Sequence, residues 1–436
     1  MQQDALVVTG LDGEKKLSGT IAINGAKNAV LQAFAFSLLF FDKVALENVP
    51  DIEDTHRMAE LLAELGLSVV AANTHRYELE VGKNVSSEFP YEPARKLRAS
   101  IVLTGPLLAR SGEVRFPHPG GCVIGNRPID VFLESFQKMG ASVKEDGKYY
   151  VITAPEGTGG RKLKGTTLFL RVPSVTATQT LMMAGVLAEG TTVIKNAALE
   201  PETEALATFL NSCGAHIQGA GTTTITIQGG ELLTAEGKSF ATPPDRIEAG
   251  SFLILGALAA KDLTLTNCDP THLDAVVEAL RDSGVPIETT PSTIVIKNNT
   301  KPNNAFKAFD IKTHEYPGFP TDLQAPATVF LTQVTGSALV FETIFEGRLN
   351  YVDGLIKMGA NIKLWDTHRA TVEGPMSLKG RDLEGPDIRA GLAYIIAATV
   401  AKGDSTIHNA YFIDRGYEQI EKRLQSIGLK IERLSA

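Results

Sequence analysis

One pattern recurs six times along this chain and restricts the folds it can adopt. An amphipathic helical segment ends at a glycine and is followed by an extended segment, as in EDTHRMAELLAELG, which ends at Gly66. Apolar residues at helical spacing predict a helix with one buried face, and glycine supplies the left-handed conformation that ends it. The alternating apolar residues that follow predict strands. The six glycines lie 69 to 75 residues apart, at Gly66, Gly140, Gly214, Gly284, Gly359 and Gly428.

A second, more apolar helix is predicted ahead of each amphipathic one. Its six versions are apolar on nearly every side, which is typical of helices buried in a core. Each unit of about 72 residues then has two helices and three or four strands. Such units are longer than the repeats of about 20–45 residues that build solenoids, so we expect two compact domains of three units each. The six segments are GAKNAVLQAFAFSLL, RKLRASIVLTGPLLA, SVTATQTLMMAGVLA, DRIEAGSFLILGALAA, PTDLQAPATVFLTQV and DIRAGLAYIIAATVA.

Composition narrows the functional classes. The 436 residues carry a formal net charge of −8, which argues against broad binding to nucleic acid or to a membrane surface. Three widely spaced cysteines give neither a disulfide framework nor a metal motif and fit a reducing cytoplasm. The N-terminus lacks a signal-peptide pattern, and the uncharged run 323–341 is a poor membrane span because it contains Pro and Gln. We therefore expect a soluble, cytoplasmic protein.

Cations recur at the predicted beginnings of these helices, where they are normally disfavoured. The N-terminal end of a helix carries partial positive charge and favours acidic residues. The pattern predicts an anionic ligand held jointly by helix ends and side chains. The alternative is that each cation pairs with a nearby acid or extends to solvent. Arg246 is left out of the site because Asp245 and Glu248 flank it. The six cations are Lys27, Arg98, Arg127, Arg348, Arg389 and Arg415.

The stretch FPHPGGCVIGNRPID, residues 116–130, is the most distinctive local motif. Its glycines and prolines exclude regular structure, so we predict a loop around Cys122. A thiol on such a loop beside Arg127 is expected to be accessible and reactive. Cys213, on an amphipathic helix, and Cys268, after a strand, are expected to be structural.

Asp322 is the acidic residue that stands out, because it opens the fifth apolar helix after a proline-rich turn. One interpretation is an ordinary acid at a helix N-terminus. The other is a general base placed among cations. The sequence supports both equally.

Seven motifs together resemble the UDP-N-acetylglucosamine enolpyruvyl transferase family, of the EPSP synthase superfamily. The resemblance runs from about residue 5 to the end, and the cysteine-loop motif is highly specific to this family. It implies a two-domain inside-out α/β barrel, built from six repeats, with the active site in the cleft between the domains. One domain would span 27–243 and the other 1–26 and 244–436. The motifs are GAKN at 25–28, RASI at 98–101, PGGCVIGNRPID at 119–130, PSV at 173–175, FPTD at 319–322, DIRA at 387–390 and DRGYE at 414–418.

The resemblance implies a reaction: transfer of the enolpyruvyl group of phosphoenolpyruvate to the 3′-hydroxyl of UDP-N-acetylglucosamine, with release of phosphate. This is the first committed step of peptidoglycan biosynthesis. Phosphoenolpyruvate carries a phosphate and a carboxylate on a small frame, so several cations must converge on it. Matching positions place Lys27, Arg127 and Arg415 at the phosphate. They place Arg348 and Arg389 at the carboxylate, with Arg98 close by.

The same resemblance assigns the proton transfers and the second substrate. Cys122 matches the family's acid, which also adds covalently to phosphoenolpyruvate and is the target of the epoxide antibiotic fosfomycin. Asp322 matches the family's base, and Lys27 is a further candidate for moving protons. Thr176 stands where the family usually has glycine. The matching sugar-nucleotide contacts are Asn28, Arg98, Arg127, Pro128, Ile129, Asp130, Ser174, Val175, Thr176, Asp322 and Ile344.

The resemblance requires no metal or organic cofactor and implies no nucleic acid, membrane or obligate protein partner. Two alternative functions compete with it. A shikimate-type enolpyruvyl transferase shares the repeat but lacks this cysteine loop. A non-catalytic paralogue that only binds the sugar nucleotide is disfavoured by the presence of Cys122, Asp322 and all six cations.

Overall fold

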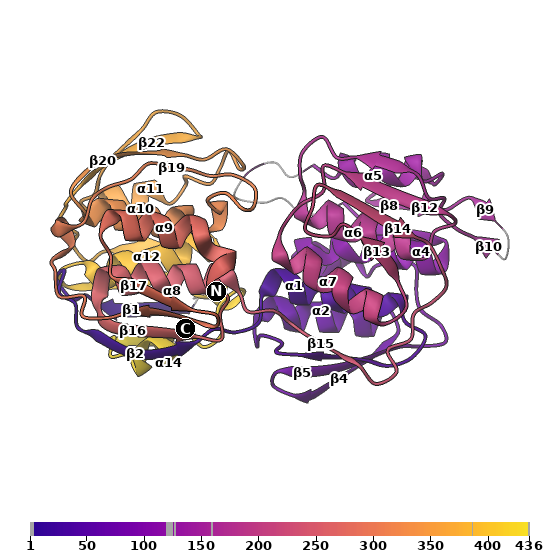
Figure 1. Cartoon of the computed structure of the whole chain (residues 1–436), viewed down its shortest axis with the longest axis horizontal. Coiled ribbons are helices and arrows are strands. Elements are labelled where there is room, and N and C mark those ends of the chain that lie inside the picture. The colour runs from indigo at the N-terminus through magenta and orange to yellow at the C-terminus, as the bar shows by residue number, and fades with distance from the viewer. Residues whose placement is uncertain (1–3, 119–124, 126–127, 158–159, 386, 435–436) are drawn as a thin grey trace. The chain divides into compact units, whose positions relative to one another are not determined.

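The computed structural model describes residues 4–118, 125, 128–157, 160–385 and 387–434. The chain forms two compact units of α/β structure (Figure 1). The first contains Met1–Asn24 and Pro244–Ala436, so it uses both ends of the chain. The second contains Gly25–Gly121 and Arg127–Pro243.

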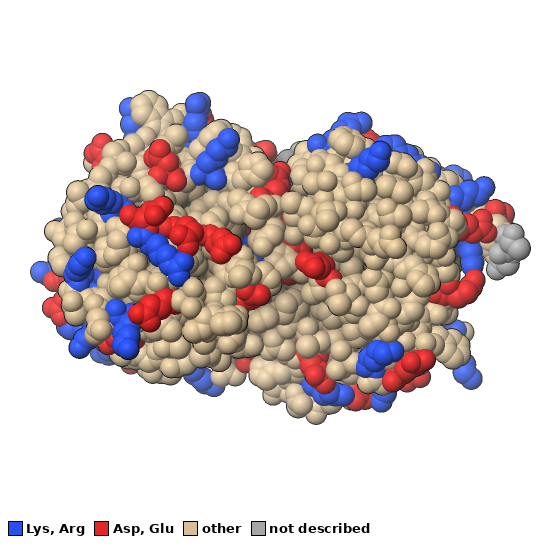
Figure 2. All heavy atoms as spheres, in the orientation of Figure 1, with Lys and Arg blue, Asp and Glu red and all other residues tan. Residues whose placement is uncertain are grey.

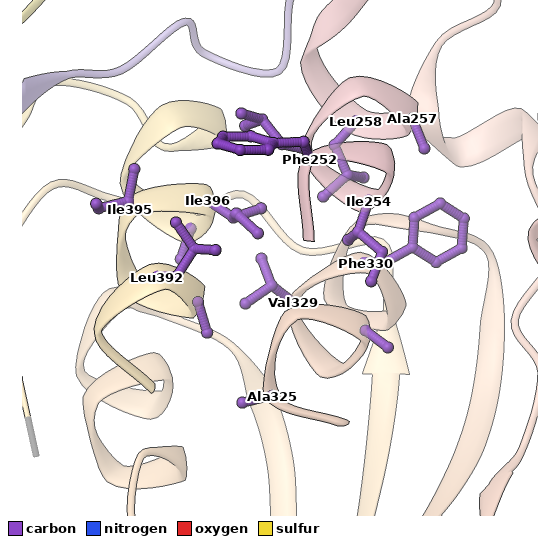
Figure 3. Close-up of a cluster of buried hydrophobic side chains, with 14 of the residues drawn as sticks. Phe252, Ile254, Ala257, Leu258, Ala325, Val329, Phe330, Leu392, Ile395 and Ile396 are labelled. Atoms are coloured by element: carbon purple, nitrogen blue, oxygen red, sulfur yellow. The ribbon is translucent and has the colours of Figure 1, made fainter. Parts of the chain in front are cut away.

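The first unit is built around three apolar helices. They are α8 (Arg246–Ala259), α10 (Thr321–Gln333) and α12 (Ile388–Val400), and each contacts the other two. Side chains from all three meet in the close-up of Figure 3, where Phe252, Val329 and Ile396 lie among their apolar neighbours. Burying one such side chain stabilises the fold by about 1.5–3 kcal/mol. The predicted burial of these helices on every side is confirmed, since all residues from Ile247 to Ala259 are buried.

The second unit has an equivalent centre with one interruption. Helix α1 (Lys27–Phe36) and helix α6 (Val175–Val186) are continuous and buried. The segment expected as one helix between them is a 3₁₀ helix, η2 (Arg98–Leu103), followed by α4 (Thr104–Ser111). Pro106 explains the break, because proline has no amide hydrogen to donate to the carbonyl of Val102.

Small sheets accompany these helices, and their strands pair in a shared pattern. In each four-stranded sheet the first two strands are parallel and the other neighbours are antiparallel. The strand orders of the second unit are β15 (Ser239–Ala241), β3 (Val44–Glu47), β5 (Arg76–Val81), β4 (Leu67–Asn73); β11 (Thr167–Phe169), β12 (Thr191–Lys195), β14 (Thr224–Gln228), β13 (His216–Gln218); β6 (Glu113–Pro117), β8 (Tyr149–Thr153), β7 (Ser142–Asp146); and the pair β9 (Glu156–Gly157), β10 (Gly160–Arg161).

The sheets of the first unit follow the same pattern, and one of them joins the two ends of the chain. Strand β1 pairs with both β24 and β25, so the N-terminal segment completes a C-terminal sheet. The orders are β23 (Asp382–Glu384), β24 (Asp404–His408), β1 (Ala5–Thr9), β25 (Ile431–Leu434); β2 (Leu17–Ala22), β16 (Ala260–Thr266), β18 (Thr293–Ile296), β17 (Ile287–Thr290); and β19 (Ile311–Lys312), β20 (Gly336–Phe341), β22 (Arg369–Gly374), β21 (Asn361–Leu364).

The glycines that end the amphipathic helices have the conformation predicted for them. All six have φ between 90° and 108°, in the left-handed region. Gly284, for example, caps α9 with its amide bonded back to the last helical turn. The helices are α2 (Glu53–Glu64), α5 (Asp130–Lys138), α7 (Pro201–Ser212), α9 (Asp274–Ser283), α11 (Val352–Met358) and α14 (Ile420–Ser426). Shorter segments are η1 (Ser37–Leu39), α3 (Tyr91–Lys96), η3 (Pro270–Leu273), η4 (Asn303–Ala305) and α13 (Tyr411–Asp414).

Charged residues on the surface are of mixed sign. Figure 2 shows Lys and Arg interspersed with Asp and Glu among the described residues of the face in view. No helix in the described part of the chain is long and apolar enough to cross a membrane.

Candidate functional site

Two buried arginines share one carboxylate at the N-terminal end of α10. Arg348 Nη2 donates to Asp322 Oδ1 at 2.8 Å. Arg389 approaches the other oxygen, with Nε at 3.2 Å and Nη2 at 3.1 Å from Asp322 Oδ2. The arginine side chains are only 6% and 7% exposed, whereas that of Asp322 is 22% exposed. In these ion pairs two positive charges face one negative charge, so the cluster favours a second anion.

The charge of Asp322 is fixed by its neighbours. Burial alone would raise the pKa of this carboxyl, but the charges of Arg389, Arg348 and Arg246 outweigh burial and hold the pKa far below its usual range. Asp322 is therefore ionised at every pH at which the protein is expected to work. Its carboxylate accepts from guanidinium groups, and it stands in the first turn of α10 without being the N-cap, which is Pro320.

Thr321 also binds Arg348 and is itself oriented by the buried Glu342. Arg348 Nη1 donates to Thr321 Oγ1 at 3.2 Å, and Thr321 Oγ1 donates to Glu342 Oε2 at 2.9 Å. The other oxygen of the buried Glu342 accepts from the amides of Ile344 and Phe345. These bonds use both carboxylate oxygens of Glu342 and orient Thr321 toward Arg348.

Arg389 is held by its own helix end and by a tyrosine. It lies in the first turn of α12, as predicted, and Asp387 caps that helix by accepting from the amides of Arg389 and Ala390. Its Nη1 donates to the hydroxyl of the buried Tyr417 at 3.0 Å. Tyr417 belongs to the DRGYE motif, which had been assigned a role only through Arg415.

A separate buried ion pair lies in the second unit. Lys27 is the first residue of α1, as predicted, and its Nζ lies 2.7 Å from Oδ2 of Asp54 in the first turn of α2. The side chains are 12% and 2% exposed. Lys27 thus has an acidic partner far from it in sequence, as do Arg348 and Arg389. The alternative interpretation of these cations, pairing with an acid, therefore describes part of their environment.

Arg348 and Arg415 do not occupy the first helical turns expected for them, whereas Arg98 lies in a first turn, although of a 3₁₀ helix. Arg98 begins the 3₁₀ helix η2. Arg348 lies in a turn before α11, which begins only at Val352. Arg415 is the C-cap of α13, where a cation is favoured by the helix dipole, and α14 begins at Ile420. The helix-start placement predicted for Arg348 and Arg415 is therefore wrong.

Arg246, which was left out of the predicted site, lies close enough to Asp322 to affect its charge. Of the two acids that flank it, Asp245 accepts from the amides of Ile247 and Glu248 at the start of α8, and the side chain of Glu248 pairs with Arg423. The Arg246 guanidinium lies 5.3 Å from the ring centroid of Tyr316, and its charge is among those that lower the pKa of Asp322. Arg246 is thus a third cation beside Asp322.

The candidate sugar-nucleotide contacts are spread over the starts of three helices and one loop. Ser174 is the N-cap of α6 and accepts from the amide of Ala177 at 3.3 Å, with Val175 and Thr176 in the first turn. Asn28 is exposed on α1, and Ile344 lies in the segment after β20. The others precede or begin α5: Pro128 and Asp130 are exposed, and Ile129 is half-buried.

The three cysteines differ in environment as far as the structure describes them. Cys213 and Cys268 are free and buried, and burial raises the pKa of both, that of Cys268 to about 11. This confirms their structural interpretation. Cys122 and Arg127 lie outside the described residues. Among the residues that are described, no group of three or more His, Cys, Asp or Glu side chains is placed to hold a metal ion.

Comparison with known proteins gives the family. The family described as "EPSP synthase (3-phosphoshikimate 1-carboxyvinyltransferase)" matches residues 11–424. A UDP-N-acetylglucosamine 1-carboxyvinyltransferase of Solibacter usitatus is 43% identical over 432 residues, covering 99% of this chain and all of the relative. A second protein of that name, from Carboxydothermus hydrogenoformans, is 43% identical and covers 98% of this chain and 99% of its own length.

Solved structures agree on the fold. The enolpyruvyl transferase NikO of Streptomyces tendae superposes with a TM-score of 0.85 at 22% identity, and each chain is covered completely. EPSP synthase of Acinetobacter baumannii superposes with a TM-score of 0.72 at 19% identity, covering 99% of this chain and all of the other. The chain therefore belongs to the EPSP synthase family and, within it, to the UDP-N-acetylglucosamine 1-carboxyvinyltransferases.

Proposed function

We propose that this protein transfers the enolpyruvyl group of phosphoenolpyruvate to the 3′-hydroxyl of UDP-N-acetylglucosamine, releasing phosphate, in the first committed step of peptidoglycan synthesis in the cytoplasm. The observation that supports this most is the pair of buried arginines that share Asp322. Such a pair suits a small dianion, and the relatives that match over the full length carry the name of this transferase.

The carboxylate of phosphoenolpyruvate would bind Arg348 and Arg389. Guanidinium groups bind carboxylates through two parallel N–H bonds, and water-poor surroundings strengthen those bonds. Both arginines now donate to Asp322, so an incoming carboxylate competes with Asp322 for the same donors. Each bond that shifts to the substrate raises the pKa of Asp322.

This competition gives Asp322 its role as general base. A carboxylate stabilised by two or three cations is a poor proton acceptor, so the ligand-free site holds Asp322 in an inactive state. Binding of the second anion weakens that stabilisation. Asp322 would then accept the proton of the sugar hydroxyl at the moment when the enolpyruvyl donor is in place.

Residues from several segments would bind the phosphate and donate the proton. Lys27, Arg127 and Arg415 would hold the phosphate, with Arg98 nearby. Cys122 would deliver the proton to the methylene carbon or add covalently to phosphoenolpyruvate. Lys27 would contribute an ammonium whose position is set by Asp54.

The sugar nucleotide would bind along the starts of three helices. The first turn of α6 offers Ser174, Val175 and Thr176, and the start of α5 offers Asp130 with the two residues before it. Asn28 and Ile344 complete the set, together with Arg98, Arg127 and Asp322. Thr176 would narrow the space that a glycine would leave beside the nucleotide.

The fold proposed for this function is the inside-out barrel of six repeats. Its support is the set of five four-stranded sheets that share one pattern of strand pairing, and the six glycines in left-handed conformation. We propose domains of 27–243 and of 1–26 with 244–436, with the active site in the cleft between them.

A phosphate-release assay tests the function. The purified full-length chain is mixed with phosphoenolpyruvate and UDP-N-acetylglucosamine, and in a parallel reaction with phosphoenolpyruvate and shikimate 3-phosphate. We expect phosphate to be released in the reaction that contains UDP-N-acetylglucosamine and not in the one that contains shikimate 3-phosphate. Release only with shikimate 3-phosphate, or with neither acceptor, would refute the proposal.

A further inference from the structure

The hydroxyl of Tyr417 bonds to Arg389, and the proposed function assigns no role to this contact. It lies on the far side of Arg389 from Asp322, 3.0 Å from Arg389 Nη1. The tyrosine is 1% exposed and the arginine 6%. Arg389 thus has fixed partners on two sides: Tyr417 at Nη1, and Asp322 at Nε and Nη2.

The directions of the hydrogen bonds follow from the donors present. Ser251 Oγ donates its one hydrogen to the carbonyl of Ile247 at 2.7 Å. Ser251 therefore accepts from the hydroxyl of Tyr417, 3.4 Å away. Arginine has no acceptor atom, so Tyr417 must accept from Arg389. The chain of bonds runs from Arg389 through Tyr417 and Ser251 to the backbone of α8, and it presents an oxygen lone pair to the guanidinium.

The two anchors of Arg389 differ in what happens to them during the reaction. Asp322 would lose hydrogen bonds from its arginines to a substrate carboxylate and would accept a proton, so its interaction with Arg389 weakens in each catalytic cycle. Tyr417 is bonded to the buried α8 and touches no reacting atom. Because the guanidinium is planar and rigid, one fixed nitrogen together with the side-chain stem sets the direction of the other two.

We propose that Tyr417 is a positioning residue that holds the Arg389 guanidinium in the orientation that takes the carboxylate of phosphoenolpyruvate. This inference rests on the proposed function and extends it to a residue that does not touch the substrate. It accounts for a buried phenol at this point in the fold, where phenylalanine would fill the same volume without bonding to Arg389.

The test compares Tyr417→Phe with a matched control, Tyr394→Phe. Tyr394 is also a buried tyrosine of the first unit, lies on the same helix as Arg389, and donates its hydroxyl to the carbonyl of Tyr351 at 2.9 Å. Both substitutions remove the hydrogen bonds of a buried phenol, one at Tyr394 and two at Tyr417, but of the two hydroxyls only that of Tyr417 bonds to Arg389. Phosphate release is measured in the full chain while each substrate is varied, and the melting temperature is recorded for every variant.

Tyr417→Phe is expected to raise the KM for phosphoenolpyruvate about tenfold, which is the scale of one hydrogen bond to a charged group. The KM for UDP-N-acetylglucosamine should change by less than twofold, and Tyr394→Phe should leave both constants within about twofold of the parent. If the parent turns over and Tyr417→Phe leaves the KM for phosphoenolpyruvate unchanged, the inference about Tyr417 is wrong and the proposed function stands. Equal changes in both variants, matched by equal losses in melting temperature, would reduce Tyr417 to a packing role. A parent that releases no phosphate would overturn the proposed function, and the inference with it.

Discussion

Replacing Asp322 by asparagine separates two effects that the wild-type carboxylate combines. Asparagine keeps the size of the side chain and one carbonyl oxygen as acceptor, but it has no negative charge and cannot take a proton. The substitution therefore removes the proposed general base. It also leaves Arg348 and Arg389 without the one carboxylate they share.

The magnitudes of the two effects can be estimated from the geometry. Removing one partner of a buried ion pair costs about 3–5 kcal/mol. The side chain of Asp322 is 22% exposed, and asparagine retains an acceptor, so we expect a loss of about 2–3 kcal/mol. For a unit of this size that lowers the melting temperature by about 4–12 °C. Loss of the base should lower kcat by about 10²–10⁴-fold.

Affinity for phosphoenolpyruvate should move in the opposite direction from the rate. Without Asp322 as a competitor, both guanidinium groups are available to the substrate carboxylate, so phosphoenolpyruvate should bind at least as tightly as to the parent. Isothermal titration with phosphoenolpyruvate in the presence of UDP-N-acetylglucosamine measures this, and phosphate release measures kcat. Asp387→Asn is the control, because asparagine still caps α12, and it should stay within a few-fold of the parent.

Two results would refute this reasoning. Turnover within about threefold of the parent would make Asp322 an ordinary helix-end acid. Loss of rate together with loss of phosphoenolpyruvate binding would mean that Asp322 serves to hold the arginines and not to accept a proton. The pH dependence of the free energy of unfolding gives a further check on the charge of Asp322. Because the pKa of Asp322 is depressed, its contribution to stability is present above about pH 4, the usual pKa of the unfolded side chain, and is lost only as pH falls below that value.

Three further predictions concern other residues. Fosfomycin should alkylate Cys122 and neither of the two buried cysteines, as located by peptide mass spectrometry, and Cys122→Asp should stay active and escape the drug; labelling of a buried cysteine would contradict this. Burial lowers the pKa of Lys15 to about 7. Between pH 7 and 9 the unfolded chain therefore binds more protons than the folded chain, and the free energy of unfolding of the parent should rise by up to about 2 kcal/mol more than that of Lys15→Met. Parallel pH profiles of the two proteins from denaturant unfolding would exclude this effect of Lys15. Lys27→Met should destabilise the second unit by about 3 kcal/mol, because it removes an ammonium group from a buried carboxylate, and Lys27→Arg should cost less; equal melting temperatures for the two variants would count against the ion pair.

Local signals predicted the helices well, because their causes are local. The six glycines were identified from apolar spacing alone, and each has the positive φ that ends its helix. The six apolar segments were likewise recognisable, since a helix with no polar face has to be buried. Gly284 and the helix before it illustrate the point, because the cap is formed by bonds within six residues.

Boundaries failed where distant contacts override local preference. The segment RGYEQIEKRLQSIG has the pattern of one helix, yet it forms the C-cap of α13, a turn and then α14. Tyr417 lies in that turn and is buried, and Gln419 takes a left-handed φ of 42°. The free energy gained by burying a tyrosine side chain exceeds the free energy lost when a few helical hydrogen bonds are not formed. No spacing within the segment shows that its tyrosine has a partner on α12.

Arg246 shows why charge partners are the hardest part of a site to infer. Two acids within two positions of it made internal pairing the economical interpretation. In the folded chain Glu248 pairs with Arg423, which lies 175 residues away in sequence, and Asp245 also accepts from backbone amides at the start of α8. Ion pairs are decided by which groups the fold brings within about 4 Å, and neighbours along a helix start compete with every group that packs against it. Acids beside a cation in sequence are therefore weak evidence about its partners, and the charge of Arg246 beside Asp322 becomes visible only in the folded structure.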